Sequence, residues 1–202
     1  MKRVYLLISF LLMFWIVSCP LQAKTILLLG DSLSSGYGIP YNKQWAALLQ
    51  NKIKNYKIVN ISEPGLTTSG GLERLPRALE LYQPSLTIIA LGANDGLRGM
   101  PISGVYNRLS QLISVAQSYG QVLLIGVRLP PNYGSEYTKK FKEMYPRLAK
   151  EHHLTFPPFL LKGVADNPLL MQSDNLHPNS QAQPVMMKTV WNSLKLLLKN
   201  AS

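Results

Sequence analysis

The chain has 202 residues, of which 47% are hydrophobic and 15% are charged, and its formal net charge is +11. This length allows one domain with a substantial core, and the composition excludes a repeat protein or a largely disordered chain. The basic residues are scattered rather than striped, which favours solubility over a dedicated anionic partner. Because no nucleic-acid-binding motif is present, no nucleic acid partner is expected.

The first 23 residues have the pattern of a signal peptide. Two basic residues precede an apolar run from Val4 to Val17, which is shorter than the roughly 20 residues that span a bilayer. Two processing routes compete. Cleavage after Ala23 would release a periplasmic or secreted protein, whereas the segment ending at Cys19 resembles a lipobox and would give a lipoprotein anchored there. We expect the soluble form, because the folded domain starts shortly after Cys19, and we expect residues 24–202 to form a single domain.

Short apolar runs then alternate with amphipathic stretches. The apolar runs predict strands at residues 25–29, 57–61, 86–91, 122–127 and 154–156. Apolar residues at helical spacing predict helices at residues 43–54, 71–81, 105–118, 137–151 and 180–198, the last with Ser180 as its N-cap. Strands that alternate with helices imply a parallel sheet with right-handed crossovers. We therefore predict an α/β fold, a three-layer α/β/α sandwich with a five-stranded parallel sheet in flavodoxin-like order.

Chemically distinctive residues follow three of these apolar runs. Ser32 follows the first run, Gly65 the second and Asn94 the third. Asp174 and His177 lie in a loop before the last helix. In open α/β sheets, ligands bind beyond the carboxyl ends of the strands, so we expect these five residues to converge at one edge of the sheet.

A serine and a histidine in such a place predict nucleophilic catalysis. The Ser32 hydroxyl needs a base to remove its proton, and His177 is the candidate, because free imidazole titrates near pH 6.5. Asp174 can orient the ring and stabilise its protonated form. The backbone N–H groups of Ser32 and Gly65 and the side-chain amide of Asn94 are candidate oxyanion-hole donors. Gly65 and Asn94 could also be ordinary turn residues.

These blocks resemble the SGNH (GDSL) hydrolase family, and within it the multifunctional bacterial thioesterases and lysophospholipases. The resemblance rests on LLLGDSLSSGYG, LGANDGLRG, RLPPNYG and HPNSQAQP, and it extends from Thr25 to about Lys199. The four letters of the family name would be Ser32, Gly65, Asn94 and His177. The resemblance implies hydrolysis of acyl thioesters, lysophospholipids and simple aryl esters through an acyl-serine intermediate. One position departs from the family relative, which has aspartate after the glycine where this chain has Leu66.

The acyl group needs an apolar groove near the serine. Five apolar loop residues are candidates to line it: Leu97, Met100, Pro130, Tyr133 and Leu176. They could equally well close the core at the edge of the sheet. We expect a small-molecule acyl ester or thioester as the substrate, transient contact with phospholipid surfaces, and a monomer.

The sequence predicts neither a cofactor nor a metal. The stretch Gly36-Tyr37-Gly38 lacks the third glycine of a dinucleotide turn, because Tyr41 stands in that position. No cysteine or histidine cluster has metal-ligand spacing. Two other functions stay open: a carbohydrate O-deacetylase of the same family, and a non-catalytic envelope lipoprotein on the same fold.

Overall fold

A computed structural model describes residues 23–156 and 158–199, so the predicted signal peptide and Cys19 lie outside the described residues. Within these residues the sheet has four strands, β1 (Lys24–Gly30), β2 (Tyr56–Asn60), β3 (Leu86–Ala90) and β4 (Gln121–Leu124). Every neighbouring pair is parallel, in the order β2-β1-β3-β4. The carboxyl ends of β1 and β3 are in register, because Gly30 pairs with Ala90.

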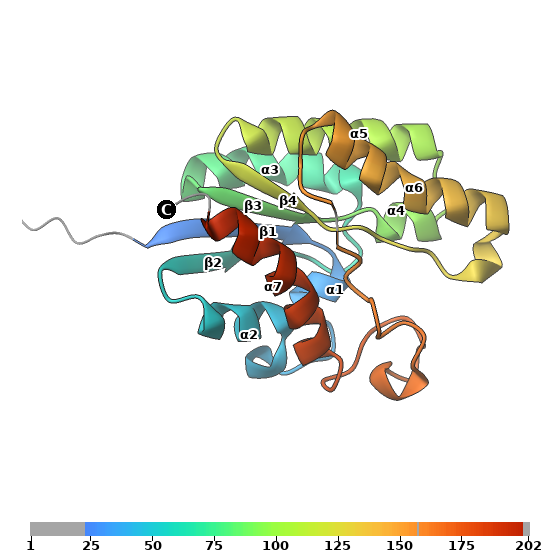
Figure 1. Ribbon diagram of the computed structural model, residues 1–202. Coiled ribbons are helices and arrows are strands. Elements are labelled where there is room, and N and C mark those ends of the chain that lie inside the picture. The colour runs from blue at the N-terminus through green and yellow to red at the C-terminus, as the bar shows by residue number, and fades with distance from the viewer. Residues whose placement is uncertain (1–22, 157, 200–202) are drawn as a thin grey trace, which may run out of the picture.

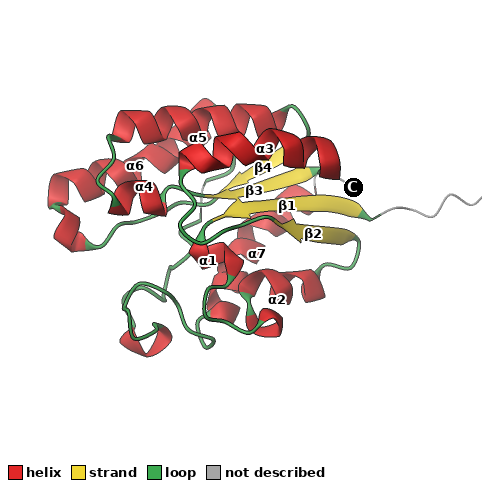
Figure 2. Cartoon of the chain, turned by 180° about the vertical axis from the view of Figure 1, so that it is seen from behind, coloured by secondary structure: helices red, strands yellow, loops and turns green. Residues whose placement is uncertain are grey.

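Helices cover both faces of this sheet (Figures 1 and 2). The longer ones are α2 (Trp45–Lys52), α3 (Thr68–Tyr82), α5 (Ile102–Gln117), α6 (Ser135–Glu151) and α7 (Gln183–Lys199). The short ones are α1 (Ser32–Ser35), α4 (Ala93–Leu97), η1 (Tyr41–Lys43), η2 (Pro131–Tyr133) and η3 (Pro168–Leu170). Within the described ranges, no helix has both the length and the apolar character needed to cross a membrane.

The side chains of the central strand β1 pack against the helices on both faces of the sheet. Ile26 and Leu28 pack in the cluster formed with α2 and α7, whereas Leu27 and Leu29 pack in the cluster formed with α3, α5 and α6. All four side chains are fully buried. A strand with helices on both faces needs a continuous apolar run rather than an alternating one, and this is the pattern in the sequence. The predicted α/β/α sandwich is confirmed.

Among the described residues, 154–156 form no strand, so the expectation of a fifth strand there is wrong. The chain at this point makes an isolated parallel bridge between Phe159 and Gly126, and the Gly126 N–H donates to the Pro158 carbonyl at 2.8 Å. The sequence has prolines at positions 157 and 158, and proline has no N–H to donate to a sheet ladder. The bridge lies just past the end of β4, and the observed strand order agrees with the flavodoxin-like prediction.

The sequence did not predict the short α-helices α1 and α4, and it placed one helix cap wrongly. Helices α1 and α4 have only four and five residues, too few to show a helical apolar period. The last helix begins at Gln183 rather than at Ser180. Asn179, and not Ser180, caps the preceding turn, because its side chain accepts a hydrogen bond from the Gln181 N–H at 2.9 Å.

Candidate active site

Helix α1 presents Ser32 directly at the end of β1. The Asp31 side chain caps the helix by accepting a hydrogen bond from the Leu33 N–H at 3.0 Å, and Ser32 is the first helical residue. The turn depends on Gly30, because a Cβ there would lie 2.6 Å from the Ser34 Cβ. The chain therefore passes from strand to helix within one residue, and Ser32 borders the cavity at the carboxyl edge of the sheet.

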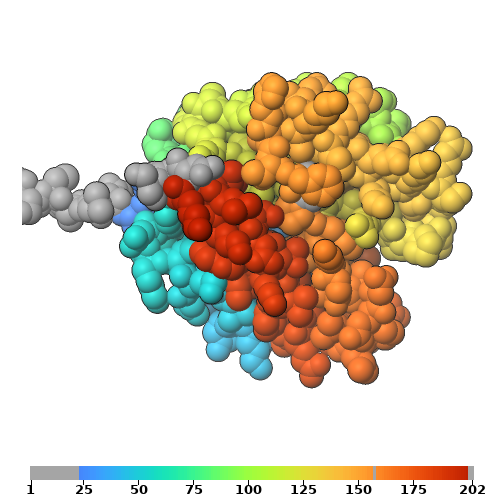
Figure 3. Space-filling model, in the orientation of Figure 1, coloured from blue at the N-terminus to red at the C-terminus, as the bar shows by residue number. Residues whose placement is uncertain are grey.

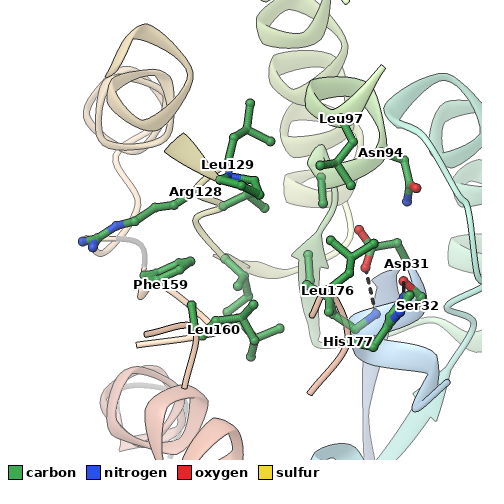
Figure 4. Close-up of a pocket in the computed structure, with 18 of the residues that line it drawn as sticks. Asp31, Ser32, Asn94, Leu97, Arg128, Leu129, Phe159, Leu160, Leu176 and His177 are labelled. Atoms are coloured by element: carbon green, nitrogen blue, oxygen red, sulfur yellow. Dashed lines mark hydrogen bonds between the residues drawn. The ribbon is translucent and has the colours of Figure 1, made fainter. Parts of the chain in front are cut away.

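Ser32, His177 and Asp174 form a continuous chain of hydrogen bonds, and Figure 4 shows Ser32 beside His177. The Ser32 Oγ lies 2.9 Å from His177 Nε2, and His177 Nδ1 lies 2.6 Å from Asp174 Oδ2. The serine and the histidine are 145 residues apart in the chain. This order of groups is the one that lets a serine lose its proton to an imidazole held by a carboxylate.

The loop before His177 holds the Asp174 carboxylate by the main chain. Asp174 Oδ1 accepts hydrogen bonds from the N–H groups of His177 and Leu176, both at 2.9 Å. The pKa of Asp174 is lowered to about 2, first by the His177 N–H, then by the His177 ring and the Leu176 N–H. The carboxylate therefore stays ionised at neutral pH, although its side chain is 41% exposed.

Three candidate oxyanion donors border the same cavity. The Ser32 N–H is the first of helix α1, and such N–H groups have no partner inside their helix. Gly65 has a φ of 79°, which favours glycine, and a Cβ there would meet no atom within 4 Å. Asn94 Nδ2 donates one hydrogen to the Leu66 carbonyl at 3.1 Å and keeps a second hydrogen for another acceptor. Since that contact uses the backbone of Leu66, it does not require the family aspartate.

A buried carboxylate fixes the segment that carries Asn94. Asp95 is fully buried. It accepts hydrogen bonds from the Thr68 N–H at 2.9 Å and the Thr68 hydroxyl at 2.6 Å, and Arg108 lies 3.3 Å away. The carboxylate thus joins α4 to the first turn of α3 and to α5. These contacts hold the turn that carries Asn94.

A cavity of about 440 Å³ extends from the triad (Figure 4). Of the predicted substrate-binding residues, the structure places Leu97, Pro130 and Leu176 in its wall and leaves Met100 and Tyr133 outside it. Met100 instead packs against the core beside α5, and its carbonyl accepts a hydrogen bond from the Tyr137 hydroxyl at 2.7 Å.

Several lining residues were not predicted from the sequence. The apolar ones include Val127, Leu129, Phe159, Leu160 and Leu161. Arg128 stacks on the Phe159 ring, 4.5 Å from its centre, at the end of the cavity away from Ser32 (Figure 4). Tyr37 is also part of the wall, and its ring centre lies 4.7 Å from that of His177. Among the described residues, no group of three His, Cys, Asp or Glu side chains could hold a metal ion.

Comparison with known proteins gives consistent matches. Residues 28–183 match the GDSL-like Lipase/Acylhydrolase family. Esterase TesA of Pseudomonas aeruginosa is 41% identical over 181 residues, which cover 87% of this chain and 90% of that protein. Thioesterase 1/protease 1/lysophospholipase L1 of Escherichia coli is 40% identical over 182 residues, covering 89% and 88%. The crystal structure of the psychrotrophic esterase EstA from Pseudoalteromonas, inhibited by monoethylphosphonate, matches with a TM-score of 0.83 at 36% identity, covering 87% of this chain and 99% of that one.

Proposed function

Because the chain belongs to the GDSL-like lipase/acylhydrolase family, we propose that it is a serine esterase that hydrolyses fatty acyl esters and thioesters through an acyl-serine intermediate. One observation carries the proposal: Asp174, His177 and Ser32 are joined by hydrogen bonds of 2.6 and 2.9 Å at the mouth of an apolar cavity. Ser32 is the nucleophile, His177 the general base and acid, and Asp174 the group that orients His177.

In the acylation step, Ser32 Oγ attacks the acyl carbon while its proton passes to His177 Nε2. The Asp174 carboxylate stabilises the imidazolium that forms. His177 then gives this proton to the oxygen or sulfur of the leaving group as the bond to the acyl carbon breaks. An alcohol or thiol leaves, and the acyl group stays on Ser32.

In the deacylation step, His177 removes a proton from a water molecule whose oxygen bonds to the acyl carbon. The proton returns to Ser32 Oγ as the acyl-serine bond breaks, and a carboxylic acid leaves. In both steps the carbonyl oxygen becomes an oxyanion, and donors fixed before the reaction stabilise it. The N–H groups of Ser32 and Gly65 and the free hydrogen of the Asn94 amide take this role.

The cavity wall supports acyl chains longer than acetyl as substrates. Apolar residues follow one another from Leu97 near Asn94 to Phe159 at the far end (Figure 4). A carbohydrate deacetylase would need polar groups that bind a sugar. The thioesterase and lysophospholipase activities in the name of the Escherichia coli relative support thioesters and lysophospholipids as substrates for this chain as well.

Localisation and partners follow as part of the same proposal. The basic and apolar N-terminal sequence supports export with cleavage after Ala23. A soluble monomer is part of the same proposal. Tyr37 and Leu176 line the cavity and are 53% and 40% exposed, which supports transient contact with a phospholipid surface. N-terminal sequencing of the exported protein tests the cleavage site, and a lipid-modified Cys19 would contradict it. Light scattering tests the monomer.

The deciding experiment measures hydrolysis of p-nitrophenyl esters from acetyl to palmitoyl by the mature protein and by Ser32→Ala. We expect activity to rise beyond acetyl and kcat to fall by on the order of 10⁴-fold or more in the variant. The control is Ser173→Ala, which removes an exposed hydroxyl beside Asp174 and should retain full activity. Activity on acetyl esters alone would support the deacetylase instead. Equal rates for Ser32→Ala and the parent protein would refute the assignment of the nucleophile.

A further inference from the structure

The loop that carries Asp174 and His177 is closed on itself. Met171 and Pro178 form an antiparallel bridge at its base. Inside this bridge the Gln172 N–H donates to the His177 carbonyl at 2.7 Å. In the space-filling view, the orange and red-orange segment that contains this loop lies at the surface, beside the red helix α7 (Figure 3). The loop is thus a small separate unit whose position relative to Ser32 must be set by contacts at its edge.

Among the described residues, two hydrogen bonds join this loop to the segment from Ser32 to Tyr37. One is the bond between Ser32 Oγ and His177 Nε2. The other runs from Gln172 Nε2 to the carbonyl of Tyr37 at 3.0 Å, and it connects residues that are 135 positions apart. The same amide nitrogen also donates to the Pro178 carbonyl at 3.0 Å, directly after His177. One side chain therefore binds the main chain on both sides of the junction.

The main chain near Tyr37 makes room for this amide. Gly38 has a φ of 71°, and a Cβ there would lie 2.7 Å from Gln172 Oε1. The backbone carbonyl of Tyr37 accepts the Gln172 hydrogen bond, and the ring of the same residue packs against the His177 ring. The Gln172 amide therefore fills the space beside Gly38 and links the segment of Ser32 to the loop of His177.

The two hydrogen bonds differ in how long they persist during turnover. The bond between Ser32 and His177 is lost when Ser32 becomes acylated, because the hydroxyl hydrogen is then gone and the oxygen is part of an ester. The bond from Gln172 to Tyr37 uses neither reacting group and persists. We propose that Gln172 is a positioning residue that keeps His177 aligned with acyl-Ser32 while water attacks. This inference rests on the proposed function.

The proposal separates the two chemical steps. Acylation starts with the Ser32–His177 bond in place, so it depends little on Gln172. Deacylation starts without that bond, so it depends strongly on Gln172. Replacing Gln172 by methionine keeps a side chain of similar length and removes both donated hydrogen bonds. We expect the deacylation rate constant and kcat to fall about tenfold, while kcat/KM changes less than about threefold and KM falls with kcat.

The experiment follows the burst of p-nitrophenol from p-nitrophenyl butyrate in a stopped-flow instrument. The burst phase reports acylation and the steady phase reports deacylation. Active sites are counted by titration with an organophosphonate ester, so a smaller folded fraction does not alter the rate constants. The control is Gln117→Met, which removes an amide donor to the His152 carbonyl at 2.9 Å at the end of α5 and should change neither phase.

A second variant keeps the test decisive if Gln172→Met does not fold. Gln172→Glu retains the shape but places a carboxylate against two carbonyl oxygens, so it should slow deacylation at least as much. Equal losses in kcat and kcat/KM, or no loss in either, would overturn the role of Gln172. The Ser32→Ala variant separates the two proposals, because inactive Ser32→Ala beside unaffected Gln172 variants refutes the positioning role alone.

Discussion

Replacing Asp31 by asparagine should stabilise the protein at neutral pH. The side chain is only 2% exposed, and burial raises its pKa from 3.8 to about 6, although the Leu33 N–H and the nearby His177 lower it in part. One pKa unit corresponds to about 1.4 kcal/mol, so the shift amounts to about 3 kcal/mol. Asparagine keeps an oxygen for the Leu33 N–H and carries no charge to bury.

The sign of the effect follows from proton binding. As pH rises from about 4 to about 6, the unfolded chain loses the Asp31 proton first while the folded state keeps it. The free energy of unfolding of the parent protein therefore falls through this window, by up to about 3 kcal/mol. Asp31→Asn lacks this contribution, so its advantage over the parent should grow by that amount between pH 4 and pH 8.

Urea unfolding of both proteins at pH 4, 5, 6 and 8 measures this difference directly. The matched control is Asp166→Asn, which replaces an exposed carboxylate in the cavity wall and leaves the buried Asp31 carboxyl in place. A constant difference for Asp31→Asn would refute the reasoning that burial of this carboxyl costs stability.

Two further substitutions test the turn between β3 and α4. Asn94→Ala removes the proposed side-chain oxyanion donor, so kcat for p-nitrophenyl butyrate should fall by about 10²–10³-fold. A rise in KM with kcat unchanged would show instead that Asn94 contributes equally to substrate and transition-state binding. Gly92→Ala places a side chain at a φ of 113°, where its Cβ would overlap the Tyr145 hydroxyl, so the free energy of unfolding should drop by about 3 kcal/mol or more. Thermal unfolding measures it, and an unchanged melting temperature would contradict the predicted strain.

The strands could be predicted where burial on both faces leaves a simple pattern. β1, β3 and β4 were found from continuous or nearly continuous apolar runs, and β1 and β3 are buried along almost their whole length. β2 was found from a shorter apolar stretch and is only partly buried. The segment at 154–156 is also partly apolar, but the two prolines that follow remove donors that a ladder needs. Apolar character alone does not report a missing N–H, which is why this strand was predicted wrongly.

In the site, too, some residues could be predicted from the sequence and others could not. Ser32, Asn94 and His177 stand in short motifs whose residue types imply a reaction, so they could be proposed from the sequence and then located in the structure. Phe159 and Gln172 act through shape and through contacts with main-chain carbonyls. Any residue supplies such a carbonyl, so the partner of Gln172, 135 residues away, leaves no trace in the sequence.

The 145-residue separation between Ser32 and His177 has a consequence for biosynthesis. The proposed nucleophile is made with the first strand, but the proposed base lies in the loop that precedes α7 and so is synthesised near the end of the chain. With these proposed roles, a growing polypeptide that already contains all four strands of the sheet still lacks the base needed to cleave an ester. On this proposal, catalytic competence requires the chain up to His177, so we expect esterase activity to report on molecules that contain the loop before α7 rather than on products truncated ahead of it.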